Sequence, residues 1–282
     1  MSKTAQLRGE FWPQDHWGRV TNAAVPREQA PVQAIEAAEE AADLALERYG
    51  DRLHSVYLSG PAARGRRGGA AIFVLLRVGS GTARGRHEEW ECAVTAELRR
   101  RHPDLGRIVI AVFEWKEVFT ADNVFSPARF RLAVNSICVA GRNMSRMLAP
   151  QRLDMAVMNQ DILNLRARLS NASARALASR GAERVKAAAM DAGAAVLAAA
   201  FALVMEREQI YTEDLDLRRD LFLLDYPGRT RDIHRAYRMA TRPSGDPDDV
   251  TAFVERVNRW LTPMADAWLN ANNPQRAERL KA

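Results

Sequence analysis

Apolar residues between positions 30 and 114 follow first a helical and then a strand-like spacing. A helix is predicted over 31–49, where Pro31 suits a first turn and Gly50 a left-handed cap, and apolar side chains recur three or four residues apart. Apolar runs of strand length follow at 53–59, 70–77 and 107–114, and a helical pattern lies over 87–101. We therefore expect a small mixed sheet with flanking helices.

From residue 127 onward the pattern is helical only. The alanine-rich stretch contains Gly181 and Gly193, and each glycine either interrupts the helix or lets another helix approach closely. The predicted fold class is α+β: an N-terminal arm at 1–29, a small mixed-sheet α/β domain at 30–126 and an all-α helical bundle at 127–282. The predicted helices of this half are 127–147, 151–170, 173–208, 213–225, 229–241 and 247–270.

The N-terminal arm is polar but contains Phe11, Trp12 and Trp17. Such a segment cannot bury three aromatic rings by itself, so they must pack on the body of the protein or on a partner. We expect a homodimer, or a complex with another protein, through residues 1–30. The alternative is that the arm folds back on its own chain and the protein is a monomer.

Composition and charge limit the binding partners and the cellular location that we expect for this protein. The net charge is +6, with 41 basic and 35 acidic residues, which permits contact with phosphates without establishing nucleic-acid binding. There is no unbroken run of eighteen apolar residues, and the start has no apolar stretch of signal-peptide type, so we expect no membrane span and a cytoplasmic location. Cys92 and Cys138 fall in predicted helices and are expected to be buried thiols.

The most distinctive stretch is 53–76, a strand, a turn rich in glycine and arginine, and a second strand. Its segments Val56-Tyr57-Leu58-Ser59-Gly60 and Ala63-Arg64-Gly65 resemble the opening motif of the nucleotidyltransferase superfamily, the DNA polymerase β-like fold. The helical half, best at 198–227, resembles the C-terminal domain of several bacterial nucleotidyltransferases, including those that act on aminoglycosides. The resemblance implies a nucleotide or phosphate site at Gly60, Arg64, Gly65, Arg66 and Arg67.

Three positions depart from the family pattern. Pro61 replaces a serine, and Ala71 and Phe73 stand where the two metal-binding aspartates would be. Carboxylates at i and i+2 of a strand share one face and together hold divalent ions, whereas alanine and phenylalanine supply no ligand. The sequence therefore predicts a pseudoenzyme that serves as a nucleotide- or phosphate-binding module or as a protein-interaction module, and we expect no cofactor.

A first alternative is an active nucleotidyltransferase with a non-standard site. Such an enzyme would need Mg²⁺ and a nucleoside triphosphate, and would move a nucleoside monophosphate to a small molecule, RNA or protein. Glu114 is the acid nearest to where the family keeps its third carboxylate, and Asp122 or Glu206 could assist it. The simpler interpretation of Glu114 is an acid at the end of a strand.

A second alternative rests on Arg229 and His234. Their Arg-x4-His spacing resembles the ribonuclease motif of HEPN helical domains, which occur in toxin–antitoxin systems beside small nucleotidyltransferases. Thr230 stands where that motif prefers Asn, His or Asp. The other interpretation is the arginine-rich start of a surface helix.

Overall fold

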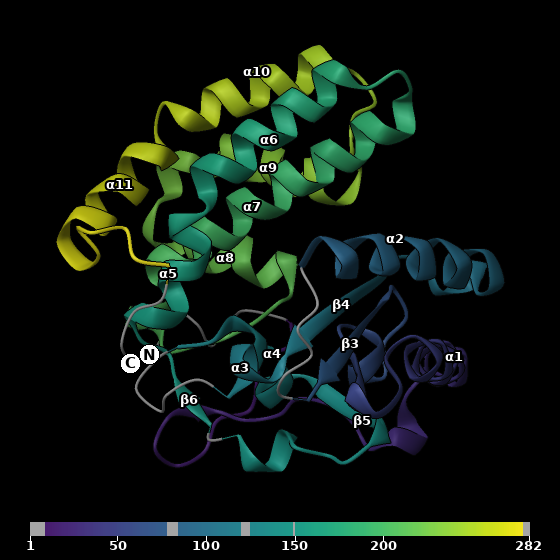
Figure 1. Ribbon diagram of the computed structural model, residues 1–282. Coiled ribbons are helices and arrows are strands. Elements are labelled where there is room, and N and C mark those ends of the chain that lie inside the picture. Colours follow the sequence, from purple (N-terminus) through teal and green to yellow (C-terminus); the bar gives the residue numbers. More distant parts are fainter. Residues whose placement is uncertain (1–8, 78–83, 120–124, 149, 279–282) are drawn as a thin grey trace. The chain divides into compact units, whose positions relative to one another are not determined.

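The protein divides into two compact units, each described by itself. The computed structural model describes residues 9–77, 84–119, 125–148 and 150–278 (Figure 1). One unit runs from Trp12 to Arg152, and the other combines Leu153–Ala282 with Met1–Phe11. The division thus falls after Arg152 instead of after residue 126, and the expected arm at 1–29 is shared between the two units.

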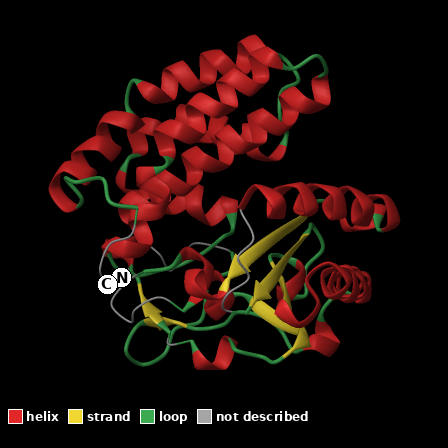
Figure 2. Ribbon diagram, viewed as in Figure 1, coloured by secondary structure: helices red, strands yellow, loops and turns green. Residues whose placement is uncertain are grey.

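A four-stranded mixed sheet is the centre of the first unit (Figure 2, yellow). Its strands are β2 (Leu53–Ser59), β3 (Ala70–Leu76), β4 (Ile108–Glu114) and β5 (Ser136–Gly141), in the order β4-β3-β2-β5. Strand β3 runs parallel to β4, and β2 is antiparallel to β3 and β5. The α+β class and the three predicted strands are confirmed, with boundaries within one residue.

Each face of this sheet has its own core. Helices α1 (Val32–Tyr49) and α2 (Arg84–Arg101) belong to one side, where alternate strand residues meet a row of alanines from α1. Short helix α3 (Trp115–Val118) and helix α4 (Pro127–Val134) contribute to the core of the other face. The first core includes Val56, Leu58, Ile72, Val74, Leu76, Ile108 and Ile110, and the second includes Tyr57, Phe73, Leu75, Leu132 and Leu148.

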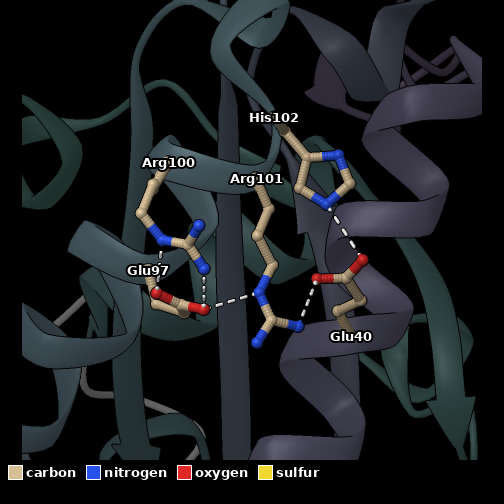
Figure 3. A network of polar contacts seen from close by, with 5 residues as sticks. All are labelled: Glu40, Glu97, Arg100, Arg101 and His102. Carbon is tan, nitrogen blue, oxygen red and sulfur yellow. Dashed lines mark hydrogen bonds and ion pairs between the residues drawn. The ribbon is translucent and has the colours of Figure 1, made fainter.

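Ion pairs join the outer surfaces of α1 and α2 (Figure 3). Glu40 of α1 contacts Arg101 at 3.4 Å and His102 at 3.2 Å, and Glu97 of α2 contacts Arg100 at 2.8 Å and Arg101 at 2.6 Å. Hydrogen bonds from Arg100 and then Arg101 lower the pKa of Glu97 to about 2. Arg101 therefore bridges the acids of two helices.

The single helix predicted over 127–147 is wrong in its second half. Asn135 ends α4, and the next six residues form β5 at the edge of the sheet. Cys138 consequently lies on a strand and is only partly buried, while Cys92 of α2 is exposed, so neither is the buried helical thiol that we expected. A separate pair of short strands, β1 (Arg19–Val20) and β6 (Gln151–Arg152), was not predicted.

The second unit contains the predicted helices and no strand among its described residues. Two expected long helices are broken, at Asn164 and between Ser179 and Gly181, and the last is broken at Arg259 and Trp260. Its helices are α5 (Met155–Leu163), α6 (Leu165–Ala178), α7 (Ala182–Glu208), α8 (Leu215–Asp225), α9 (Thr230–Thr241), α10 (Pro247–Asn258) and α11 (Leu261–Asn272). Across both units, the 3₁₀ turns among the described residues are Arg27–Gln29, Gly50–Arg52, Ala62–Arg64, Pro103–Leu105, Ser145–Met147 and Pro227–Arg229.

Helix α7 is the core of this unit. Gly181 precedes it as its N-cap, and Gly193 lies against the backbone of α9, so each glycine plays one of the two expected parts. Among the described helices, α7 alone is long and apolar enough to cross a membrane, but most of its apolar stretch is buried inside the unit. Packing within the protein accounts for its hydrophobicity.

Candidate functional site

The turn between β2 and β3 depends on two glycines. Gly60 (φ +79°) follows β2, and Gly65 (φ +73°) ends the 3₁₀ turn Ala62–Arg64. Both angles lie in the left-handed region, which glycine adopts at little cost. The Gly residues of the expected motif are thus required by the shape of the turn itself.

Several backbone N–H groups of this turn already donate hydrogen bonds to carbonyls within the turn. The N–H groups of Arg64 and Arg66 both donate to the carbonyl of Pro61 at 3.0 Å. The N–H of Ala62 donates to Gly69 and that of Gly65 donates to Ala62, each at 3.1 Å. A phosphate-binding turn offers its amides outward, and these four amides point to partners inside the turn.

Arg64 lies under the N-terminal segment. Its side chain is buried, and its guanidinium carbon lies 4.4 Å from the centre of the Trp12 ring. Trp12 is 3% exposed, and its indole N–H donates to the carbonyl of Val134 at 3.0 Å. Trp12 therefore packs on the body of its own unit, one of the two expected outcomes for the arm's aromatic residues, and covers the arginine.

The same segment also contacts the middle of the turn. The N–H of Val25 donates to the carbonyl of Ala63 at 2.9 Å, and the Val25 side chain approaches Gly65. Arg66 and Arg67, in contrast, are exposed. Of the five predicted phosphate-binding residues, these two present their side chains to solvent.

Positions 71 and 73 lie on the sheet face that packs with α4. Their neighbours in the sheet register are Ser59 and Val109 for Ala71, and Tyr57 and Ala111 for Phe73. Phe73 is 5% exposed, and its ring centre lies 5.2 Å from that of Phe113. The rings of Phe73 and Phe113 fill the space beside position 73, and neither ring offers an oxygen to a metal ion.

Tyr57 brings a buried polar group to this face. Its hydroxyl accepts hydrogen bonds from the N–H of Met144 at 2.9 Å and from the hydroxyl of Ser55 at 3.2 Å. Ser55 in turn contacts Nδ1 of His54 at 2.8 Å. Burial raises the pKa of Tyr57, and burial followed by the charges of Arg77 and Arg142 lowers the pKa of His54. This chain of contacts anchors the segment after β5 to the sheet.

Glu114 is not near the positions of the lost aspartates. It is paired with Leu76, whereas Ala71 is paired with Val109, five residues earlier on β4. At about 3.3 Å per residue Glu114 is about 17 Å along the strands from the level of Ala71, and about 10 Å from that of Phe73, which pairs with Ala111. The odd separation also places Glu114 on the opposite face. In the sheet register Glu114 thus lies at the end of β4, as in the simpler interpretation of an acid at the end of a strand.

Glu114 instead ends a buried hydrogen-bonded chain that the sequence did not reveal. The hydroxyl of Tyr49 contacts Nδ1 of His87 at 3.0 Å, and Nε2 of His87 contacts the Glu114 carboxylate at 3.2 Å. The order hydroxyl, imidazole, carboxylate matches a nucleophile with its base and orienting acid. Tyr49 is 4% exposed and burial raises its pKa to about 12, which disfavours the ionised hydroxyl, and the three side chains join α1, α2 and β4.

The other candidate residues are Arg229, His234, Glu206 and Asp122. Arg229 precedes α9, with its guanidinium carbon 4.9 Å from the centre of the Trp260 ring, and His234 is exposed on α9. Glu206 belongs to the helical unit, and Asp122 lies outside the described residues. Within the described ranges, no group of three or more His, Cys, Asp and Glu side chains is placed to hold a metal ion.

Comparison of the sequence with known protein families gave no matching family model, and comparison with curated proteins gave no significant match.

Proposed function

We propose that this chain is a non-catalytic protein of nucleotidyltransferase-like fold that serves as a protein-interaction module. The observation that carries the proposal is the packing of Phe73 against Phe113 at the position where the family holds its metal ions. Hard oxygen ligands are needed there for nucleotidyl transfer, and the residues at 71 and 73 have none.

The order of elements in the first unit supports the fold part of this proposal. Helix α1, strand β2, a short 3₁₀ turn, strand β3, helix α2 and strand β4 follow one another, with β2 antiparallel to β3. This is the succession that the resemblance implies for residues 30–114. The coverage of Arg64 by Trp12 supports the loss of the phosphate site, because the expected anion ligand already has a partner.

Calorimetry with Mg²⁺ and each of the four ribonucleoside triphosphates tests the catalytic part. We expect no binding heat, and no label transfer to aminoglycosides, tRNA or protein. Magnesium-dependent pyrophosphate release would contradict the proposal. Comparison of the Glu114→Gln variant with the wild type would then show whether Glu114 is the acid responsible. The Ala71→Asp, Phe73→Asp double variant should remain inactive, because carboxylates at these sites enter an apolar core.

Thermal shift separates a surviving phosphate site from an interaction module. Arg66 and Arg67 are exposed, so weak binding of nucleotides to them should equal binding of inorganic phosphate and vanish in the Arg66→Gln, Arg67→Gln variant. A stabilisation specific to one nucleotide that survives this variant would favour a nucleotide-binding module.

The interaction surface that we propose is centred on Trp17. This residue is 57% exposed between Asp15 and Arg19, with the Arg19 guanidinium 4.5 Å from its ring centre. Asp15 holds Arg19 at 2.7 Å and accepts the N–H of Trp17 at 3.0 Å, so the aromatic ring is presented by a fixed turn. Exposed tryptophans of this kind anchor interfaces.

Light scattering of the wild type and the Trp17→Ala variant tests self-association. A dimer that dissociates in the variant would support a homodimer through residues 1–30, whereas two monomers would restrict the proposal to a different protein partner. Truncation before Ala30 is a poor test, because it also removes the buried Trp12.

A further inference from the structure

A cavity of about 550 Å³ lies within the first unit, between strand β5 and the N-terminal segment 20–27. Its volume falls within the range of about 300–1,000 Å³ that is usual for small-molecule sites. The wall combines aliphatic side chains with amides and hydroxyls. The residues used below are Asn22, Arg27, Ser136, Cys138, Asn143 and Ser145.

The cavity follows the edge of the sheet. Ser136, Ile137 and Cys138 are consecutive residues of β5, and all three line it. Successive side chains of a strand point to opposite faces, so a cavity over one face would meet only alternate residues. Because β5 is the last strand in the order β4-β3-β2-β5, this edge has no further strand beside it.

The chain itself occupies the two ends of this edge with side chains. At one end the Asn22 carboxamide accepts the N–H of Ser136 at 3.2 Å and donates to its carbonyl at 2.9 Å. At the other end Nη1 of Arg27 donates to the carbonyl of Val139 at 3.1 Å. One carboxamide thus satisfies both main-chain groups of Ser136 as a neighbouring strand would.

Cys138 lies between these two points. In an antiparallel ladder the residues alternate between those bonded to the partner strand and those that turn their N–H and C=O outward. Ser136, paired with Ser59, turns outward to Asn22, so Cys138, paired with Tyr57 two positions along, also faces outward. No contact recorded among the described residues uses the N–H or C=O of Cys138 on that edge.

The electrostatics of the wall favour an uncharged ligand. Among the described lining residues there is no acid and Arg27 is the one cation, and its guanidinium is already engaged by Glu39 and by the carbonyl of Val139. Asn143 and Ser145 add neutral polar groups at the wall. A charged ligand would lose hydration without gaining a counter-charge.

We propose that this cavity binds a small uncharged molecule bearing a carboxamide, which pairs with the N–H and C=O of Cys138 as Asn22 pairs with Ser136. The remainder of the ligand lies against Val20, Val25 and Leu148. The proposal is independent of the proposed function, because the cavity lies on the opposite edge of the sheet from β4.

Selective labelling provides a direct test, because the chain contains two cysteines. With [¹⁵N]cysteine the NMR spectrum of the full chain contains the amide signals of Cys138 and Cys92, and the exposed Cys92 of α2 is an internal control. Benzamide at about 10 mM, well above a fragment Kd of about 1 mM, should shift the Cys138 signal and leave Cys92 unchanged. Benzoate, its charged counterpart, should shift neither.

Two outcomes would overturn the proposal: an unchanged Cys138 signal with benzamide, or equal shifts with benzamide and benzoate. Two variants then separate main chain from side chain by ligand-observed NMR. Cys138→Ala keeps the outward N–H and should bind benzamide as the wild type does. Cys138→Pro removes it at an edge position that tolerates proline, and binding should weaken about fivefold or more. If the proline variant does not fold, the labelled wild type decides alone.

Discussion

Replacing Gly193 by alanine should destabilise the helical unit, although alanine is the better helix former. A Cβ at this position would lie 2.5 Å from the carbonyl oxygen of Ala236 and from the N of Ala240, and 2.9 Å from Cβ of Met239. Non-bonded heavy atoms in ordinary van der Waals contact are about 3.5 Å apart. Two of the three atoms belong to the backbone of α9. No rotamer change relieves the overlap, so α7 and α9 must separate by about 1 Å.

The expected change in the free energy of unfolding follows from two opposing effects. Overpacking a core costs about 1–3 kcal/mol, and a displaced helix pair belongs at the upper end of that range. Alanine in place of glycine returns about 1 kcal/mol through helix propensity. The net expectation is a loss of about 2 kcal/mol in the free energy of unfolding.

Hydrogen exchange read by mass spectrometry is the appropriate assay, because the chain has two units and global unfolding need not be two-state. Peptides from α7 and α9 should exchange faster in Gly193→Ala, with those of the sheet unchanged. Gly228→Ala is the matched control, since nothing lies within 4 Å of its added Cβ. Unchanged or greater protection of α9 in Gly193→Ala would refute the close approach of the two helices.

Three further substitutions test the sheet unit. Trp12→Ala should lower its stability by about 3 kcal/mol, measured by urea unfolding, because a buried ring and a hydrogen bond to Val134 are lost. Tyr57→Phe should cost about 1–2 kcal/mol by leaving the N–H of Met144 without its acceptor, whereas Tyr226→Phe on the surface should have no effect. The pKa of Glu97 is depressed from 4.5 to about 2, so its stabilising contribution is complete above pH 4.5 and is lost as pH falls toward 2. Thermal melts of Glu97→Gln should therefore show a smaller decline across that window than the wild type, and equal declines would contradict the assigned ion pairs.

The strands β2 and β3 could be predicted because their apolar runs are short and are bounded by glycine. The segment 136–141 could not, because a short apolar run fits a buried strand and a helix equally well, and pairing with β2 decides between them. The two possible roles of Gly181 and Gly193 were predictable as alternatives, but which glycine interrupts the helix depends on the position of α9.

The candidate site was less predictable than the fold. The sequence placed Ala71 and Phe73 together on one face, since that follows from strand periodicity alone. The distance of Glu114 from them depends on the parallel register of β4, and the burial of Arg64 depends on Trp12. Both are contacts between residues far apart in the sequence, which local patterns do not reveal. The outward edge at Cys138 depends in the same way on a ladder that the sequence does not display.

The N-terminal segment has a consequence for biosynthesis. Trp12, Asn22 and Arg27 bond to residues 122, 114 and 112 positions later in the chain. At about 5–20 residues per second, a ribosome needs roughly 6–24 s to make the partner of Trp12 after Trp12 itself. During that interval the indole N–H of Trp12 lacks its acceptor, although Ala63 and Arg64, which also contact this segment, have already been made. The contacts of residues 12–27 with strand β5 and with the residues just before it therefore form only after residues 134–139 have been added, later than the contacts of the same segment with the turn at 63–65.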